Sequence, residues 1–171
     1  MIIVNTGNGK GKTTAAIGQI IRALGQGFNV CLIQLFKGES FYGEQKILTG
    51  LKGLDFFSYA KEHPFCIEGI TMGQTKESCS PAFAKLSEIA NSYKKYDFVV
   101  LEEFNIAMRD GFINITETIN LIKQLSEKST VIVTGRSAPQ ELIDIADIVT
   151  EMKEVKHSYN KGVKAQKGIE F

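Results

Sequence analysis

The chain has few of the residues that disulfide-linked or zinc-binding domains require. Its 171 residues include only three cysteines and two histidines. The cysteines, Cys31, Cys66 and Cys79, are odd in number and scattered, and the sequence contains no CxxC pair. This pattern argues against a disulfide framework and against a cysteine-histidine zinc site. It favours a reducing compartment, the cytoplasm.

The chain also lacks a strong net charge and a long apolar run. Its formal net charge is +1, so no global positive field would attract nucleic acid or an anionic membrane. No apolar stretch is long enough to span a bilayer, and no signal segment precedes the glycine-rich loop near the start. We therefore expect a soluble cytoplasmic protein that binds neither nucleic acid nor membrane.

The length and apolar content indicate one domain. With 43% apolar residues in 171, the chain can build one well-formed core but not two ordinary ones. The sequence shows no internal repeat, low-complexity tract or linker. We therefore expect a single domain that covers residues 1–171.

Apolar runs alternate with helical patterns along the chain. Buried strands are predicted for residues 1–5, 29–35, 53–59, 98–102, 130–135 and 148–156. Helices are predicted to begin at Gly11, at Ser80 with Pro81, at Asn114 and at Ser137. Long loops are expected at residues 36–52 and 60–80. The alternation predicts an α/β fold with a mostly parallel sheet that is flanked by helices on both faces.

Residues 6–14, TGNGKGKTT, predict a phosphate-binding loop between the first strand and the first helix. The usual pattern is a glycine, any four residues and then Gly-Lys-Ser/Thr, so Thr6 stands where the first glycine is expected. The context compensates for this difference, because free amides and the helix dipole at the start of a helix favour phosphate. The competing interpretation is a glycine-rich turn with incidental lysines.

The residue types within this loop suit a nucleotide triphosphate. Gly7, Gly9 and Gly11 let the backbone turn tightly and approach an anion without obstruction by side chains. Lys12 would neutralise phosphate oxygens, and the hydroxyl of Thr13 would bind a magnesium ion. These roles predict a nucleotide-binding domain, but they do not identify the bond that is cleaved.

Two acidic residues end the strand at residues 98–102. Glu102 and Glu103 would lie at the same edge of a parallel sheet as the phosphate loop, where an acid can help to hold the metal. The alternative is that both are ordinary solvated residues at the end of a strand. The phosphate loop in the same sheet favours the functional interpretation.

Four segments together carry a more specific resemblance. The sequences NTGNGKGKTTAA, VVLEEFNIAMRDGFI, VIVTGRSAPQELIDIADIVTEMK and VKHSYNKGVKAQKGIEF resemble the ATP:corrinoid adenosyltransferases. The resemblance extends from Asn5 to the last residue and is weakest between residues 36 and 80. It implies a RecA-like P-loop fold, a homodimer and transfer of the 5′-deoxyadenosyl group of ATP to the cobalt(I) of a corrinoid. Triphosphate would be the leaving group, and an electron donor such as a flavoprotein would reduce the cobalt.

The residues of the site fit this chemistry. Cobalt(I) is itself a strong nucleophile, so the protein need only align it with the 5′ carbon and stabilise the departing polyanion. Catalysis is assigned to Lys12, Thr13 and Glu103, of which Thr13 and Glu103 would hold Mg²⁺, or Mn²⁺ in its place. The residues expected to bind ATP, with Arg136 carried over from the resemblance, are Gly7, Asn8, Gly9, Lys10, Gly11, Lys12, Thr13, Thr14 and Arg136.

Two features depart from the family pattern. The acidic pair is usually Asp-Glu, whereas here it is Glu102 and Glu103. Some members also carry an N-terminal extension that helps to cover the corrinoid, whereas this sequence begins at its first strand. Aromatic residues of the long loops are therefore candidate walls of the corrinoid site or, equally, packing residues: Phe36, Phe41, Tyr42 and Phe65.

Two other functions stay open at this point. A P-loop ATPase would cleave the γ-phosphate, with Glu103 orienting water. A non-catalytic carrier would bind ATP and a corrinoid only to deliver a finished cofactor. His157 could suggest a cobalt ligand, but a lone histidine is more often structural. The neighbouring lysines are expected to form a solvated surface.

Overall fold

The computed structural model describes residues 1–38, 42–60, 63, 69–93 and 95–171. A six-stranded sheet runs through it, in the order β3-β2-β4-β5-β1-β6. Its strands are β1 (Ile2–Thr6), β2 (Val30–Leu35), β3 (Leu54–Tyr59), β4 (Phe98–Glu102), β5 (Thr130–Thr134) and β6 (Ile148–Glu151). Every pair of neighbouring strands is parallel. The predicted α/β fold with helices on both faces is confirmed.

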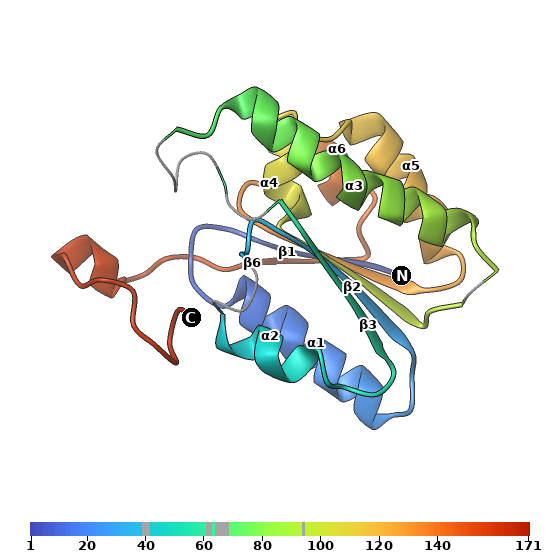
Figure 1. Ribbon diagram of the computed structural model, residues 1–171, viewed down its shortest axis with the longest axis horizontal. Coiled ribbons are helices and arrows are strands. Elements are labelled where there is room, and N and C mark those ends of the chain that lie inside the picture. Colours follow the sequence, from blue (N-terminus) through green and yellow to red (C-terminus); the bar gives the residue numbers. More distant parts are fainter. Residues whose placement is uncertain (39–41, 61–62, 64–68, 94) are drawn as a thin grey trace.

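Helices cover both faces of the sheet. Figure 1 shows α1 (Lys12–Gly25) and α2 (Gly43–Leu48) on one face, and α3 (Met72–Asn91), α4 (Phe104–Arg109), α5 (Ile115–Ser126) and α6 (Gln140–Ile143) on the other. Successive side chains of a strand point to opposite faces. Leu32 of β2 accordingly packs in the core beneath α1, whereas Ile33 packs in the core beneath α3. Burial on both faces explains why β2 is apolar at nearly every position. No helix in the described residues is both long and apolar enough to cross a membrane.

The start of α3 was predicted wrongly. The helix begins at Met72, eight residues before the predicted start at Ser80, and Pro81 lies inside it. Thr71 caps the helix, because its side chain accepts a hydrogen bond from the amide of Gln74 while the Gln74 side chain accepts one from the amide of Thr71. This reciprocal capping satisfies two amides at the helix start. The interpretation of Pro81 as a first-turn residue therefore placed the boundary too late.

Two helices and two boundaries also differ from the prediction. The expected loop at residues 36–52 contains α2, and the short helix α4, which was not predicted, follows β4 directly. Helix α6 begins after Pro139 rather than at Ser137, which has a positive φ of 53°. Strand β6 ends at Glu151 because the chain then leaves the sheet edge and crosses the phosphate loop. The predicted helix start at Asn114 is confirmed, since its side chain accepts a bond from the amide of Glu117 at 3.0 Å.

Candidate functional site

The loops that follow β1, β2, β4 and β5 meet at the carboxyl edge of the sheet, where a parallel sheet usually binds its ligands. Together with the C-terminal segment they enclose a cavity of about 1010 Å³. Nearly all of the predicted site residues line this cavity: Asn8, Gly9, Lys10, Gly11, Lys12, Thr13, Thr14, Glu103 and Arg136. The fold therefore brings residues from three separate parts of the sequence to one place.

The phosphate loop is packed against the chain that follows β6. The amide of Gly9 donates a 2.6 Å hydrogen bond to the carbonyl oxygen of Met152, and the Met152 amide donates to the Thr6 oxygen at 2.8 Å. A Cβ atom would lie 2.5 Å from the Met152 carbonyl oxygen at position 7 and 2.7 Å from it at position 9. Gly7 and Gly9 are therefore needed for contact with Met152 as well as for the turn itself. The Gly9 amide is occupied by this contact.

Lys12 begins α1 and is directed back into the loop. Its Nζ donates 2.7 Å hydrogen bonds to the carbonyl oxygens of Gly7 and Gly9. The side chain is buried, and this burial lowers the pKa of Lys12, while the carboxylate of Glu103 opposes the change. A buried ammonium bound only to neutral carbonyl oxygens attracts an anion strongly. This is the behaviour expected of a lysine that binds phosphate.

The two acidic residues take different positions. Glu102 is 1% exposed, and its carboxylate accepts hydrogen bonds from the hydroxyls of Thr13 and Thr134. The hydroxyl of Thr13 thus contacts Glu102, whereas Glu103 was predicted to share a metal with it. Lys37, which follows β2, adds its ammonium 3.4 Å from Glu102 Oε1. Lys37 was not predicted to lie in the site, although a lysine at the carboxyl end of a neighbouring strand was a usable signal.

Glu103 faces the cavity. Its φ of 64° is in the left-handed region that residues other than glycine rarely adopt, and Glu103 follows β4 and occupies the N-cap position of α4. Its amide donates to Thr134 Oγ1 at 3.1 Å, but its Oε2 is buried and has no hydrogen-bond partner in the described part of the chain. Burial raises the pKa of Glu103 to about 7, and the neighbouring charge of Glu102 contributes. A buried carboxylate oxygen without a partner is costly, so it suits a group that completes its environment on binding.

Arg136 lines the cavity and follows β5 after Gly135. The Asn105 Nδ2 amide group donates a 2.9 Å hydrogen bond to the carbonyl oxygen of Gly135 and fixes the turn before it. The side chain of Arg136 is exposed and is close enough to lower the pKa of both Lys12 and Glu103. An exposed guanidinium at the rim of a cavity can bind phosphate oxygens in bidentate fashion.

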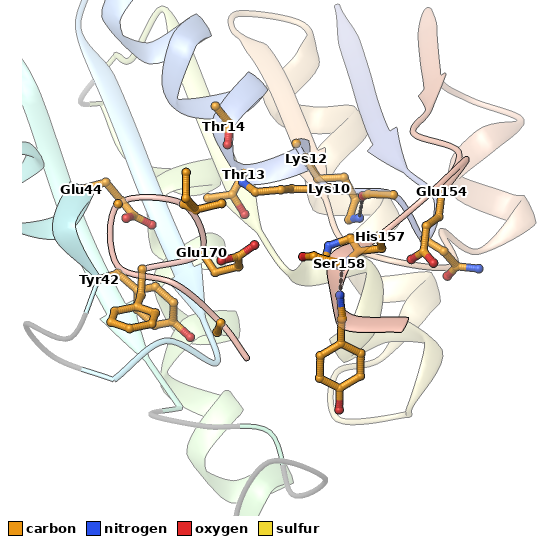
Figure 2. A pocket seen from close by; sticks show the side chains of 18 of the residues that line it. Lys10, Lys12, Thr13, Thr14, Tyr42, Glu44, Glu154, His157, Ser158 and Glu170 are labelled. Carbon is orange, nitrogen blue, oxygen red and sulfur yellow. Dashed lines mark hydrogen bonds between the residues drawn. The ribbon is translucent and has the colours of Figure 1, made fainter. Parts of the chain in front are cut away.

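The C-terminal segment forms the opposite wall. Figure 2 shows Lys10, Lys12 and Thr13 on the side of the phosphate loop, and Glu154, His157 and Ser158 on the C-terminal segment. The segment contains a 3-10 turn (Ser158–Lys161) and contributes apolar as well as polar side chains to the cavity. This role was not predicted, because the segment has no strong helical or strand pattern. Its specific resemblance to a known family was the available signal.

The remaining candidates are His157 and the four aromatic residues of the long loops. The Nδ1 atom of His157 accepts a 3.1 Å bond from the amide of Tyr159, which gives it a structural role at the 3-10 turn. Tyr42 lines the cavity, whereas the ring of Phe36 packs 5.9 Å from the ring of Phe112. Two further candidate walls, Phe41 and Phe65, lie outside the described residues.

The donor set near Thr13 fits a divalent cation. Mg²⁺ usually takes one or two carboxylates, a hydroxyl and the phosphates of the substrate, and it does not need a cage made only of protein. The Thr13 hydroxyl and the Glu102 carboxylate are in contact, and Glu103, which has a buried oxygen without a hydrogen-bond partner in the described residues, is among the residues that line the same cavity. No group of three or more His, Cys, Asp or Glu side chains in the described residues could hold a metal without the substrate.

Comparisons with known proteins agree with this geometry. The family model described as ATP:corrinoid adenosyltransferase BtuR/CobO/CobP matches residues 1–171. A corrinoid adenosyltransferase of Sinorhizobium sp is 36% identical over 172 residues, which cover 100% of this chain and 80% of that protein. The corrinoid adenosyltransferase of Escherichia coli K12 is 35% identical over 175 residues, with 100% and 85% covered. The corrinoid adenosyltransferase CobA of Salmonella typhimurium LT2 is 36% identical with the same coverage. The chain therefore belongs to the ATP:corrinoid adenosyltransferase family.

Proposed function

We propose that this protein transfers the 5′-deoxyadenosyl group of ATP to the cobalt(I) of a corrinoid and releases triphosphate. The observation that carries the proposal is the composition of the cavity within a chain of this family. One end presents a phosphate loop and cations, and the other end is formed by a segment with apolar side chains. Such a cavity can hold a triphosphate and an adenosine together, because its volume of about 1010 Å³ is at the upper end of ordinary ligand sites.

The reaction needs no nucleophile from the protein. The electron pair of cobalt(I) forms the new bond to the 5′ carbon of ATP. The bond between this carbon and the α-phosphate oxygen breaks, and its electron pair leaves with triphosphate. The work left to the protein is to align the two reacting atoms and to stabilise the negative charge of the leaving group.

The phosphate loop and the basic side chains are proposed to bind the triphosphate. Lys12 would exchange its two carbonyl partners for phosphate oxygens, while Lys10 and Arg136 would approach from the open side of the cavity. Free loop amides would add further hydrogen bonds at the start of α1, where the helix dipole favours an anion. The exposure of Arg136 and the burial of Lys12 support this division.

A divalent metal is proposed to bind beside the triphosphate. Thr13 and Glu103 are the residues we assign to it, and the contact between Thr13 and Glu102 adds a second carboxylate next to them. Mg²⁺, or Mn²⁺ in its place, would supply positive charge that stabilises the leaving triphosphate. The protein's own part is to hold the hydroxyl and carboxylate oxygens in position.

The C-terminal segment is proposed to cover the adenosine. Its cavity-lining side chains include Val163, Ile169 and Phe171 as apolar surface and Asn160 as a polar group. An apolar surface with a few polar groups is typical of sites that bind a base. The hydrogen bond from Gly9 to Met152 ties the start of this segment to the loop that would hold the phosphates.

Other properties are proposed on the basis of family membership. The chain would work in the cytoplasm as a single domain within a homodimer, and a flavoprotein or another electron donor would supply cobalt(I). ATP and the reduced corrinoid would be its ligands, and it would bind neither nucleic acid nor membranes. The net charge of +1 supports the last expectation.

The test is anaerobic incubation with Mg²⁺, ATP and a chemically reduced corrinoid. The expected products are triphosphate and a corrinoid whose absorption spectrum reverts on exposure to light, as a cobalt-carbon bond requires. A γ-phosphate hydrolase would instead produce ADP and phosphate whether or not a corrinoid is present. A carrier would bind both ligands without turnover, and either of these results would contradict the proposal.

A further inference from the structure

Lys37 lies between the side chains of Thr13, Glu102 and Glu44. It follows β2 in the chain, after Phe36, whose φ of 59° turns the backbone at the end of the strand. The hydroxyl of Ser58 donates a 3.1 Å hydrogen bond to the Lys37 carbonyl oxygen and fixes this turn. The Lys37 side chain is 11% exposed, so its ammonium lies inside the protein. A charged group is rarely buried to this extent without partners of opposite charge.

The ammonium of Lys37 contacts the Thr13 hydroxyl, which we assign to the metal, and the Glu102 carboxylate beside it. Its Nζ lies 3.2 Å from Thr13 Oγ1 and 3.4 Å from Glu102 Oε1. The Glu102 side chain is 2% exposed and accepts bonds from two hydroxyls besides this ion pair. A cation is therefore already present beside the Thr13 hydroxyl, and it is supplied by the protein.

Lys37 also has a second set of partners on the other side. The Glu44 Oε1 atom lies 3.5 Å from its Nζ, and the Tyr42 ring centroid lies 5.0 Å from it. A carboxylate and the face of an aromatic ring both attract an ammonium. The Lys37 ammonium can thus move away from Glu102 and keep favourable contacts, because a flexible four-carbon stem carries it.

A divalent ion and this ammonium cannot both bind Glu102 when no phosphate is present. The two cations would share the Glu102 carboxylate at a separation of a few ångströms, and their repulsion would be strong. A bound triphosphate brings several negative charges, which can accept a metal and an ammonium together. Whether the metal binds should therefore depend on whether the triphosphate is there.

We propose that Lys37 occupies the cation position between Thr13 and Glu102 in the nucleotide-free protein and gives it up to the divalent metal when the triphosphate binds. The inference rests on the proposed function for the identity of the phosphate ligand. It makes Lys37 a positioning residue that couples the binding of metal to the binding of nucleotide. The protein alone would bind Mg²⁺ weakly, and the loaded site would hold the metal, the triphosphate and Lys37 together.

The experiment measures Mn²⁺ binding by electron paramagnetic resonance for the wild type, Lys37→Met and Lys37→Arg. Methionine keeps the length of the side chain and removes its charge, whereas arginine keeps the charge. Without nucleotide, Lys37→Met is expected to bind Mn²⁺ roughly tenfold more tightly than the wild type, or better, because Glu102 loses its competing partner. The same variant should gain thermal stability from Mn²⁺ alone. With inorganic tripolyphosphate added, the advantage of Lys37→Met should disappear or reverse.

Lys46→Met is the matched control. Lys46 lies in α2 and is exposed. Its replacement by methionine changes the net charge by the same amount as Lys37→Met but leaves the contacts of the site unchanged. It should bind Mn²⁺ as the wild type does. If Lys46→Met tightens Mn²⁺ binding as much as Lys37→Met, the effect is one of net charge and the inference is wrong.

Two further outcomes would overturn the inference. One is that Lys37→Met and the wild type bind Mn²⁺ equally in the absence of phosphate. The other is that Lys37→Arg, which keeps a cation in place, binds Mn²⁺ more tightly than the wild type, and this result does not depend on whether Lys37→Met folds. Adenosyl transfer is measured separately, so an inactive wild type would contradict the proposed function and leave the Mn²⁺ result to be judged on its own.

Discussion

Substitution of Gly9 by alanine tests whether the C-terminal segment is held by the phosphate loop. The new Cβ would lie 2.7 Å from the Met152 carbonyl oxygen and 2.8 Å from the Lys153 carbonyl carbon. If the segment stayed in place, overpacking of this kind would cost about 1–3 kcal/mol. If it moved away, the loss would be the two hydrogen bonds that join the loop to Met152, at about 1 kcal/mol each. The two estimates are similar, and the segment after Met152 is exposed, so it can move away from the loop.

We therefore expect Gly9→Ala to lower the free energy of unfolding by about 2 kcal/mol and to release the segment. ATP affinity should then fall well below that of the wild type, whereas affinity for tripolyphosphate should change little. Urea denaturation and isothermal titration calorimetry would measure the two effects. Gly18→Ala is the matched control, because Gly18 lies within α1 and a Cβ there meets nothing within 4 Å. It should stabilise the protein by about 0.5–1 kcal/mol. Equal losses of ATP and tripolyphosphate affinity in Gly9→Ala would show that the contact with Met152 does not hold the segment over the adenosine.

Three further predictions concern the loop lysine, an ion pair and a buried thiol. Lys12→Ala should abolish adenosyl transfer and leave the circular dichroism spectrum unchanged; retained activity would remove Lys12 from the site. The hydrogen bonds from Arg109 and then His63 lower the pKa of Asp110, so this carboxylate stabilises the fold above its unfolded pKa and loses its effect as the pH falls through the lower folded value. Urea denaturation should therefore show Asp110→Asn to be less stable than the wild type by up to about 1 kcal/mol at pH 7, with a difference that shrinks as the pH falls below the unfolded pKa and vanishes below the folded pKa. Burial raises the pKa of the Cys79 thiol to about 12. Peptide mass spectrometry after iodoacetamide treatment at about pH 8 should find Cys79 unmodified in the native protein and modified in urea, and native modification would contradict its burial.

The strands and the phosphate loop could be predicted because their signals are local. A run such as that in β2 is apolar at nearly every position, which burial on both faces requires. The start of α3 shows where local signals compete. Thr71 and Gln74 carried a capping pattern, but Pro81 with Ser80 gave a second one, and the sequence does not tell which of them begins the helix. The short helix α4 has too few residues to show a helical period.

The contacts within the site depend on strand order, which the sequence did not reveal. Met152 reaches Gly9 because β6 lies next to β1, although the two strands are far apart in the chain. Lys37 reaches Glu102 because β2 lies next to β4. The different directions of Glu102 and Glu103 also follow from a backbone turn, since Glu103 has a positive φ that no residue pattern indicated. The residue types of the site were therefore predictable, whereas their pairing was not.

Two charged groups, Glu103 and Lys12, lie in the part of the site that would bind the leaving group. Glu103 has a buried oxygen without a hydrogen-bond partner in the described residues, and Lys12 bonds only the neutral carbonyl oxygens of Gly7 and Gly9. A cation would complete the first of these, and phosphate oxygens would complete the second. Binding energy accelerates a reaction only when it is greater in the transition state than in the ground state. Negative charge builds up on the triphosphate as the bond to the 5′ carbon breaks. The attraction between the triphosphate and the positive groups around it is therefore stronger in the transition state than in the ground state. In the proposed reaction, Lys12 and Glu103 would therefore act on the leaving group, and the corrinoid would supply the nucleophile.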